Sequence, residues 1–382
     1  GILNTSSDST TGHVYSMDGS YTVTLDATSG CLADSVAQVV QIGGPQCTSS
    51  VVGKTTKGTE FWLAFGQNLV TTDLEIYITS DVATSGVVDI PQTGWNVPYT
   101  VGPSSTVTIT VPVTNVVTGN QFIQDRGIRV VSDDPVSVMA ASIWSLSSDA
   151  TLVLPRSVLG THYRVMNYDT TAGLFVVVAL ECNTTVQITP SNTTLAGSAG
   201  GVPFTVVLDS GQTYQVKATA VAGLIGSVVE TLDNKPIAVF GGHNIAVIGN
   251  CMAGDHIMDQ LYPTELWGTE YITNPLQSRT WDQIMILANT NGTDVTIDGG
   301  TPITLNAGDF IDTAVSAPIY ISSTAPVAVS EFATGAACFN NSIGPYGDPF
   351  MVGLNPLSFT IDTTLFEALG TLGASTVHYV NI

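Results

Sequence analysis

The 382-residue sequence has few basic residues: nine Lys and Arg stand against 31 Asp and Glu, and the net charge is −22 at pH 7. Charged residues make up only 10% of the chain and apolar residues 44%, so the composition is that of a folded protein, not of a charge-rich disordered chain. Nucleic acids and anionic membranes require clustered Lys and Arg. We therefore expect no nucleic-acid partner.

The sequence also lacks a long apolar run. The longest weakly polar stretch, residues 218–229, is about 12 residues long, whereas about 20 are needed to span a bilayer. We find no initiator Met, signal peptide or C-terminal sorting tail. We expect no membrane insertion of this segment, and we interpret it as a piece of a longer exported chain.

Cysteine is sparse, and the five residues form neither a Cys-x-x-Cys pair nor a Cys/His cluster with zinc spacing. This disfavours a metal site, and the wide spacing favours an oxidising compartment. Cys31 and Cys47 flank a hairpin-like stretch and predict one disulfide. Cys251 has two candidate partners, Cys182 and Cys338, and the residues leave the choice open, with one thiol left over.

Three short markers recur in the same order and indicate repeated units. Gly-Thr-[Glu/His]-[Phe/Tyr] begins at Gly58, Gly160 and Gly268, which are 102 and 108 residues apart. A turn with a short strand follows each copy, and then a Pro followed by an apolar strand. Alternating apolar residues between frequent turns predict an all-β chain of tandem Ig-like sandwiches of about 100 residues each.

This spacing predicts short junctions and packed neighbouring units. The predicted segments are the C-terminal part of a PKD- or Ig-like β-domain (1–47), three β-sandwich units (48–153, 154–262 and 263–372) and the first strand of a further unit (373–382).

No serine-hydrolase, zinc-protease, phosphate-binding or EF-hand motif is present. Reactive residue types gather only at Cys251, Asp255, His256 and Asp259, where a thiol beside a histidine could be a nucleophile and the carboxylates with the histidine could bind a metal. Because the segment lies at a repeat junction and exported cysteines usually pair, we interpret it as a hydrogen-bonded structural loop. We predict no enzyme activity and no resident cofactor.

Turn carboxylates are candidate ligands for calcium, which would stiffen the junctions between units; solvated turns are the alternative. The candidates are Asp133, Asp134, Asp294, Asp298 and Asp348.

Tryptophans divide into two groups. Trp62 and Trp267 lie in or beside the repeat markers and are expected in cores, whereas Trp95 has a loop-like context and is the candidate for stacking on a ligand. Asn-x-Ser/Thr and Asp-Ser/Thr patterns mark candidate glycosylation sites, with ordinary polar turns as the alternative. The candidates are Asn183, Asn192, Asn291, Asn340, Thr170, Thr313 and Thr363.

Four stretches resemble the IgGFc-binding protein N-terminal domain family and together cover about residues 54–382. They are Lys57-Gly-Thr-Glu-Phe-Trp-Leu-Ala-Phe65, Leu154-Pro-Arg-Ser-Val-Leu-Gly-Thr-His-Tyr163, Asp255-His-Ile-Met-Asp-Gln-Leu-Tyr-Pro-Thr-Glu-Leu-Trp-Gly268 and Gly347-Asp-Pro-Phe-Met351. Residues 1–47 resemble the tail of a PKD-like repeat. Family members usually have a Cys directly before the Asp-His pair, where this sequence has Gly254, and this departure favours pairing of Cys251 with Cys182 or Cys338.

The resemblance implies a large extracellular adhesive or matrix protein, in bacteria a giant surface protein exported by the type IX system and linked to gliding motility. We therefore expect a non-enzymatic structural or adhesive segment of a cell-surface-attached protein. Its expected partners are the neighbouring domains of the same chain and the secretion machinery during export. The alternative is a glycan- or protein-binding module that uses loop aromatics.

Overall fold

The computed structural model describes residues 19–29, 32–42, 55–168, 172–219, 223–276, 279–338 and 347–359. Contacts divide the chain into two units, residues 1–52 and 53–382. The first unit contains one antiparallel hairpin, in which β1 (Gly19–Ser29) pairs with β2 (Leu32–Ile42).

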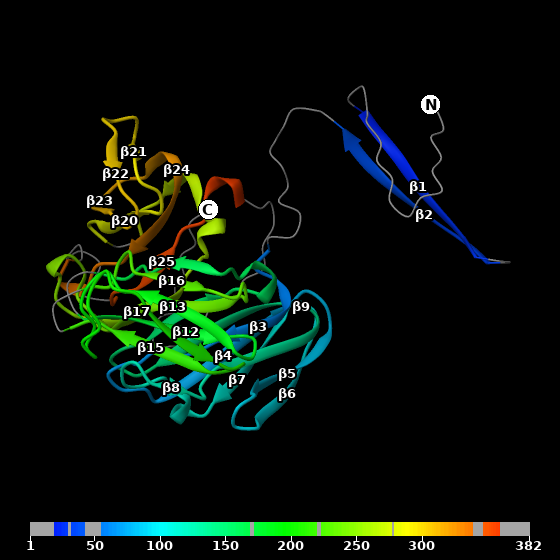
Figure 1. Ribbon diagram of the computed structural model, residues 1–382, viewed down its shortest axis with the longest axis horizontal. Helices are drawn as coiled ribbons and strands as arrows, with labels where there is room; N and C mark the ends of the chain where they lie inside the picture. Colours follow the sequence, from blue (N-terminus) through cyan, green and yellow to red (C-terminus); the bar gives the residue numbers. More distant parts are fainter. Residues whose placement is uncertain are drawn as a thin grey trace. The chain divides into compact units, whose positions relative to one another are not determined.

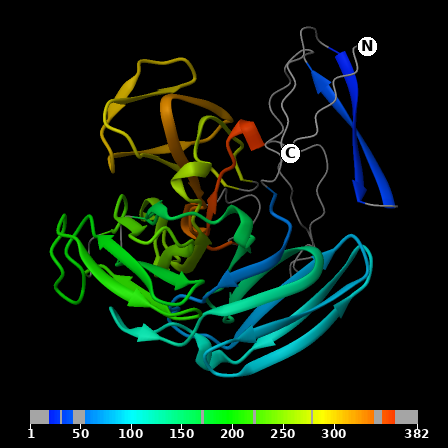
Figure 2. The same cartoon turned by 45° about the vertical axis from the view of Figure 1, so that its right-hand side comes forward.

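The second unit confirms the predicted all-β class (Figure 1). Across the described residues, the helical elements are short 3-10 turns, and none is long and apolar enough to cross a membrane. The strands form three groups that follow one another along the chain, coloured blue to cyan, green, and yellow to orange in Figure 2. Each group curls into two layers, and we call the groups the first, second and third sandwich.

The first sandwich is organised by one long strand, β9, that belongs to both layers. The first half of β9 pairs with β3 and β5, and the second half pairs with β4 and β10. The outer strands β6 and β7 complete the two layers. The strands are β3 (Gly58–Leu63), β4 (Asp73–Ser80), β5 (Thr84–Ile90), β6 (Trp95–Val101), β7 (Ser105–Val111), β9 (Ile128–Ile143) and β10 (Asp149–Val153).

The second sandwich repeats this order, with two strands, β16 and β17, in place of β9. One layer runs β11-β16-β13-β14, and the other runs β18-β17-β12-β15 and ends on β8 (Ile123–Gln124). The strands are β11 (His162–Arg164), β12 (Gly173–Ala179), β13 (Thr184–Thr189), β14 (Phe204–Leu208), β15 (Thr213–Lys217), β16 (Val228–Thr231), β17 (Ile237–Ala246) and β18 (Asp255–Gln260).

The third sandwich again has one long shared strand, β24. Its first half pairs with β19 and β21, and its second half with β20 and β25. The strands are β19 (Gly268–Thr273), β20 (Asp282–Ala288), β21 (Thr293–Ile297), β22 (Ile303–Leu305), β23 (Phe310–Val315), β24 (Ile319–Phe332) and β25 (Met351–Gly353).

Neighbouring sandwiches share their cores through the strands β12 and β20. Both strands are buried along their whole length. In β12, Leu174 and Val176 pack into the first core, whereas Phe175 and Val177 pack into the second. The side chains of β20 alternate in the same way between the second and third cores. A strand covered on both faces reads as a continuous apolar run, which explains the sequences Leu-Phe-Val-Val-Val and Ile-Met-Ile-Leu.

The repeat markers occupy equivalent places in the three sandwiches. Gly58, Gly160 and Gly268 each begin or precede a first strand, and a Cβ at these positions would lie 2.4, 2.6 and 2.2 Å from the Cβ of Pro155, Pro263 and Pro356 respectively. Each proline is followed by a 3-10 turn: η2 (Arg156–Val158), η4 (Thr264–Leu266) or η6 (Leu357–Phe359). Glycine is therefore required where the proline folds back onto the first strand.

A second pair of glycine contacts joins consecutive sandwiches. The N–H of Gly127 donates to the carbonyl of Gly211 at 2.9 Å, and a Cβ on Gly226 would lie 2.6 Å from the carbonyl oxygen of Gly308. Gly211 and Gly308 occupy the same turn of successive sandwiches, both with positive φ. The two junctions between sandwiches are thus built from the same contact.

Candidate functional site

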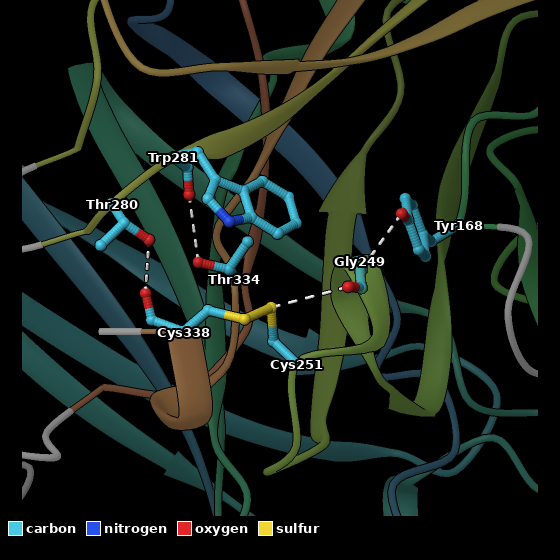
Figure 3. Close-up of a disulfide and its surroundings, with 7 residues drawn as sticks. All are labelled: Tyr168, Gly249, Cys251, Thr280, Trp281, Thr334 and Cys338. Atoms are coloured by element: carbon cyan, nitrogen blue, oxygen red, sulfur yellow. Dashed lines mark hydrogen bonds between the residues drawn. A yellow bond between two sulfur atoms is a disulfide. The ribbon is translucent and has the colours of Figure 1, made fainter. Parts of the chain in front are cut away.

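The cluster singled out by sequence lies at the junction between the second and third sandwiches. Cys251 follows η3 (Ile248–Asn250) and is bonded to Cys338 at the end of η5 (Ala336–Cys338), with 5.5 Å between the Cα atoms (Figure 3). The alternative pairing with Cys182 is wrong, because Cys182 is an exposed free thiol. The sulfur of Cys251 is held in a disulfide and is not a thiolate, so it cannot act as a nucleophile with the neighbouring histidine as its base.

Close packing and hydrogen bonds fix the segments around the disulfide (Figure 3). A Cβ on Gly249, whose φ is +59°, would lie 1.9 Å from the Trp281 ring, so only glycine fits beside this indole. The Thr280 hydroxyl donates to the Cys338 carbonyl at 2.7 Å, and the Thr334 hydroxyl donates to the Trp281 carbonyl at 3.1 Å. Both ends of the disulfide are therefore anchored in ordered backbone.

The histidine of the cluster is buried and neutral. His256 is fully buried, its Nδ1 donates to the carbonyl of His243 at 2.7 Å, and burial lowers its pKa to about 4. His243 is also fully buried, and its Nε2 accepts the N–H of Tyr168 at 2.9 Å. Burial likewise lowers the pKa of His243 to about 4. These imidazoles fix backbone positions and stay uncharged at neutral pH.

Asp255 and Asp259, both in β18, have raised pKa values. Asp255 is 3% exposed, and burial, helped by the negative charge of Asp348, raises its pKa to about 7. Burial raises the pKa of Asp259 to about 6. Asp259 Oδ1 accepts the Thr151 hydroxyl at 2.7 Å, and Oδ2 accepts the N–H of Gly353 at 2.7 Å. One carboxyl group thus links β10, β18 and β25, which belong to three different sandwiches.

Further polar groups along β10 and β18 complete this junction. Asp149 Oδ2 accepts the N–H of Met258 at 2.8 Å, and burial raises the pKa of Asp149. Gln260 donates its N–H to the Thr151 hydroxyl at 2.9 Å and accepts the N–H of Leu154 through Oε1 at 2.6 Å. These contacts hold strands of consecutive sandwiches together. The arrangement is a hydrogen-bonded structural junction.

Asp149, Thr151 and Gln260 were not predicted as site residues. One signal was available: Thr151 and Asp259 both lie four residues before a marker proline, Pro155 or Pro263.

A second buried charged cluster lies in the third sandwich and was also missed. Asp282 is fully buried and Glu331 is 3% exposed; burial, together with the charge of Asp282, raises the pKa of Glu331 to about 7. Arg279 lies with its Nε 4.0 Å from Asp282 Oδ1, and its Nη2 donates to the carbonyl of Asp348 at 3.2 Å. Its guanidinium lies over the ring of Phe350, 5.6 Å from the centroid.

The calcium candidates lie at three separate places. Asp133 and Asp134 are in β9, where Asp133 accepts the Ser85 hydroxyl. Asp294 accepts the Thr304 hydroxyl at 2.5 Å, and Asp298 accepts the N–H of Tyr320 at 2.7 Å. Asp348 is near Asp255. In the described part of the chain, no three His, Cys, Asp or Glu side chains are placed to share a metal ion.

The tryptophans are placed mainly in cores. Trp62 and Trp267 are 2% and 8% exposed, as expected. Trp95 is not in a loop: it is the first residue of β6 and packs, partly buried, against the first core. The apolar ring of Trp95 lies next to that core, which explains why this residue is part of a strand and not of a loop as predicted.

Among the glycosylation candidates, Asn183, Asn192 and Asn291 are exposed, whereas Thr313 is partly buried within β23. Asn340, Thr170, Thr363 and the predicted Cys31–Cys47 disulfide lie outside the described residues.

Comparison with known proteins agrees with the sequence resemblance. Residues 149–382, more than half of the chain, match the family model described as IgGFc binding protein. The human IgGFc-binding protein is 29% identical over 261 residues, which cover 65% of this chain but only 5% of the human protein. No solved structure matches. The match contains β10, β18, β25 and the disulfide, and the chain belongs to the IgGFc-binding protein family.

Proposed function

We propose that the chain is a non-enzymatic structural and adhesive segment of a large secreted protein attached to a cell surface. One observation carries this proposal: the cluster at residues 251–260 is tied by a disulfide and by hydrogen bonds of Asp259 to strands of the neighbouring sandwiches. Shared cores across β12 and β20 support a stiff block suited to spacing and display. The chain covers only 5% of the length of its human relative, so what we say about the activity of a whole parent protein is also a proposal.

The finer organisation is proposed on the repeat spacing. The proposed units are residues 48–153, 154–262 and 263–372, preceded by a PKD-like tail (1–47) and followed by the first strand of a further unit (373–382). The same packing of a marker proline against a marker glycine recurs three times along the chain, and this supports the proposed units. The proposed parent is a bacterial giant adhesin that is exported by the type IX system, linked to gliding and in contact with the secretion machinery during export.

The charge distribution supports an exported, self-repelling surface. The 31 Asp and Glu outnumber the nine Lys and Arg, so the surface charge is mainly negative. In the described part of the chain, each basic residue also has a hydrogen bond or ion pair within the chain. These residues are Lys57, Lys217, Lys235, Arg126, Arg129, Arg156, Arg164 and Arg279. The Cys251–Cys338 disulfide favours an oxidising, extracellular location.

The second candidate function is a protein- or glycan-binding module. Phe122 is 64% exposed and Leu195 is 57% exposed, and they lie on adjoining segments, because the Thr194 hydroxyl donates to Gln121 Oε1 at 2.8 Å. Exposed apolar groups of this kind favour a protein ligand. The human relative is named for IgG Fc binding, and Fc is therefore the first ligand to test.

Binding of the 382-residue chain to a glycan array and to immobilised human IgG Fc tests the proposal. A spacer gives no saturable signal on either surface. Saturable binding that is lost in a Phe122→Ser/Leu195→Ser variant, or in Trp95→Ala, would overturn the spacer role in favour of the binding module. Thermal unfolding of each variant controls for folding.

A calorimetric titration of calcium into chelator-treated protein tests the carboxylate candidates separately. No heat and no change in melting temperature would remove calcium from the proposal.

A further inference from the structure

We infer that the Cys251–Cys338 disulfide transmits tension past the third sandwich, so that β19 to β24 stay folded when the chain is pulled from its ends. The inference rests on the proposed function in one respect, since a surface-attached segment bears load. The force path itself depends only on the placement of the disulfide and of the strands around it.

The covalent path is short because the disulfide bypasses most of the third sandwich. Cys251 and Cys338 are 87 residues apart, and the loop they close contains β18 to β24. Cys251 follows β17 closely, so its backbone continues directly into the second sandwich. Tension that reaches Cys338 therefore crosses the sulfur–sulfur bond to Cys251 and does not act along residues 252–337.

Residues 347–359, which we call the terminal strap, lie outside the disulfide loop. β25 pairs with only three residues of β24, the Gly353 N–H donates to Asp259, and Pro356 packs against Gly268. By contrast, β20 pairs with six residues of β24 and six of β23. The strap has far fewer hydrogen bonds than the sheet it covers, so it detaches first under load.

The contacts that receive the strap lie within the protected loop. Asp259 and Gly268 are between the two cysteines, and β24 also lies between them. When the strap detaches, tension passes through the disulfide, and these receiving groups keep their positions. The strap can therefore bind again when the load falls, and this gives a short reversible extension without unfolding of the third core.

Optical-tweezers pulling on the full chain, with handles ligated to both ends, tests the inference. For residues 53–382 of the disulfide-bonded protein we expect a first release of the 13 residues of the terminal strap, about 4 nm of contour length, that reverses on relaxation. For the Cys251→Ala/Cys338→Ala variant we expect a further release of about 30 nm immediately after the strap detaches, since the 86 residues between positions 251 and 338 now bear load. Cys182→Ala is the matched control and behaves as the parent.

The inference is overturned if the disulfide-bonded chain also releases the further 30 nm at the same force, or if the first release from residues 53–382 is not the strap; opening of the β1–β2 hairpin is a separate event of the first unit. Chemical reduction of the parent chain while it is held under tension repeats the comparison without relying on the folding of a variant. Failure of the spacer role would appear as saturable ligand binding and would leave these force–extension curves unchanged.

Discussion

Asp259 accepts the backbone N–H of Gly353 at 2.7 Å, and through this bond the second sandwich holds the last strand of the third. The other oxygen of Asp259 accepts the Thr151 hydroxyl. Asp259→Asn replaces one acceptor oxygen with an NH2 donor, which opposes one of the two bonds. We expect a loss of about 1–3 kcal/mol in the free energy of unfolding, measured by urea denaturation.

Asp134→Asn is the matched control for that substitution, because Asp134 is an exposed carboxylate in β9. It is expected to change the free energy of unfolding by less than about 0.5 kcal/mol. Equal effects of the two substitutions would contradict a junction role for Asp259.

Stability is expected to fall as the pH rises through neutrality. The pKa values of Asp255 and Glu331 are raised to about 7, so the folded state holds protons that the unfolded state releases near pH 4; their contribution is largest at acid pH and is lost as the pH rises through 7. The pKa values of His243 and His256 are lowered to about 4, so their effect has the opposite sign and fades only above pH 6.5, where the unfolded-state histidines lose their remaining protons. Between pH 6.5 and 8 the carboxyl effect is the larger of the two.

We therefore expect a net decrease of about 0.5–1 kcal/mol over that interval, measured by urea denaturation at each pH. Glu331→Gln should flatten the profile, whereas the exposed control Asp73→Asn should retain it. A profile that rises between pH 6.5 and 8 would contradict the assignment.

Gly226→Ala is expected to destabilise the junction between the second and third sandwiches. The substitution combines a φ of +80° with a Cβ only 2.6 Å from the carbonyl oxygen of Gly308, and we expect a loss of about 2–4 kcal/mol. Gly201 also has a positive φ, +74°, but a Cβ there meets nothing within 4 Å. Gly201→Ala should therefore cost only about 1–2 kcal/mol, and the difference between the two melting curves measures the contact itself.

Two tyrosines make the same buried hydrogen-bond pair in different sandwiches. The Tyr163 hydroxyl donates to the carbonyl of Ile237 at 2.7 Å and accepts the N–H of Gly160 at 3.0 Å; Tyr271 makes the equivalent bonds with Val327 and Gly268. Tyr163→Phe should lower the free energy of unfolding by about 1–3 kcal/mol, because the buried backbone groups lose their partner.

Tyr320→Phe serves as the control in the same denaturation assay, since Tyr320 is 37% exposed and its hydroxyl bonds only to a surface glutamate, Glu270. A loss as large as that of Tyr163→Phe would argue against the buried pair as the cause.

The all-β class was predictable because alternation within strands and spacing between turns are local properties of the sequence. The apolar marker residues Phe61, Tyr163 and Tyr271 were recognisable because each is a core residue at the same point of a strand. The continuous apolar runs in β12 and β20 also had a local signal, but their cause, a second core on the outer face, depends on the neighbouring sandwich.

The candidate site could be predicted only in part. Asp255, His256 and Asp259 stood out by residue type, and their place at a repeat junction followed from the marker spacing. The choice of Cys338 over Cys182 required the position of η5 beside η3, which no spacing rule provides. Glu331 and Asp282 were missed because single acidic residues in strands give no periodic signal, and their mutual approach is set by pairing between β20 and β24.

The glycine contacts have a consequence for how such a chain lengthens by gene duplication. In sandwich two the turn residue is Gly211 and in sandwich three it is Gly308, whereas the first sandwich has Ser104 there, also at positive φ. The receiving glycines Gly127 and Gly226 correspond to Pro318 in the third sandwich. A copy added before the first sandwich or after the third would thus meet a side chain where the internal junctions have none, whereas a second copy of the middle sandwich would keep glycine on both sides of each junction.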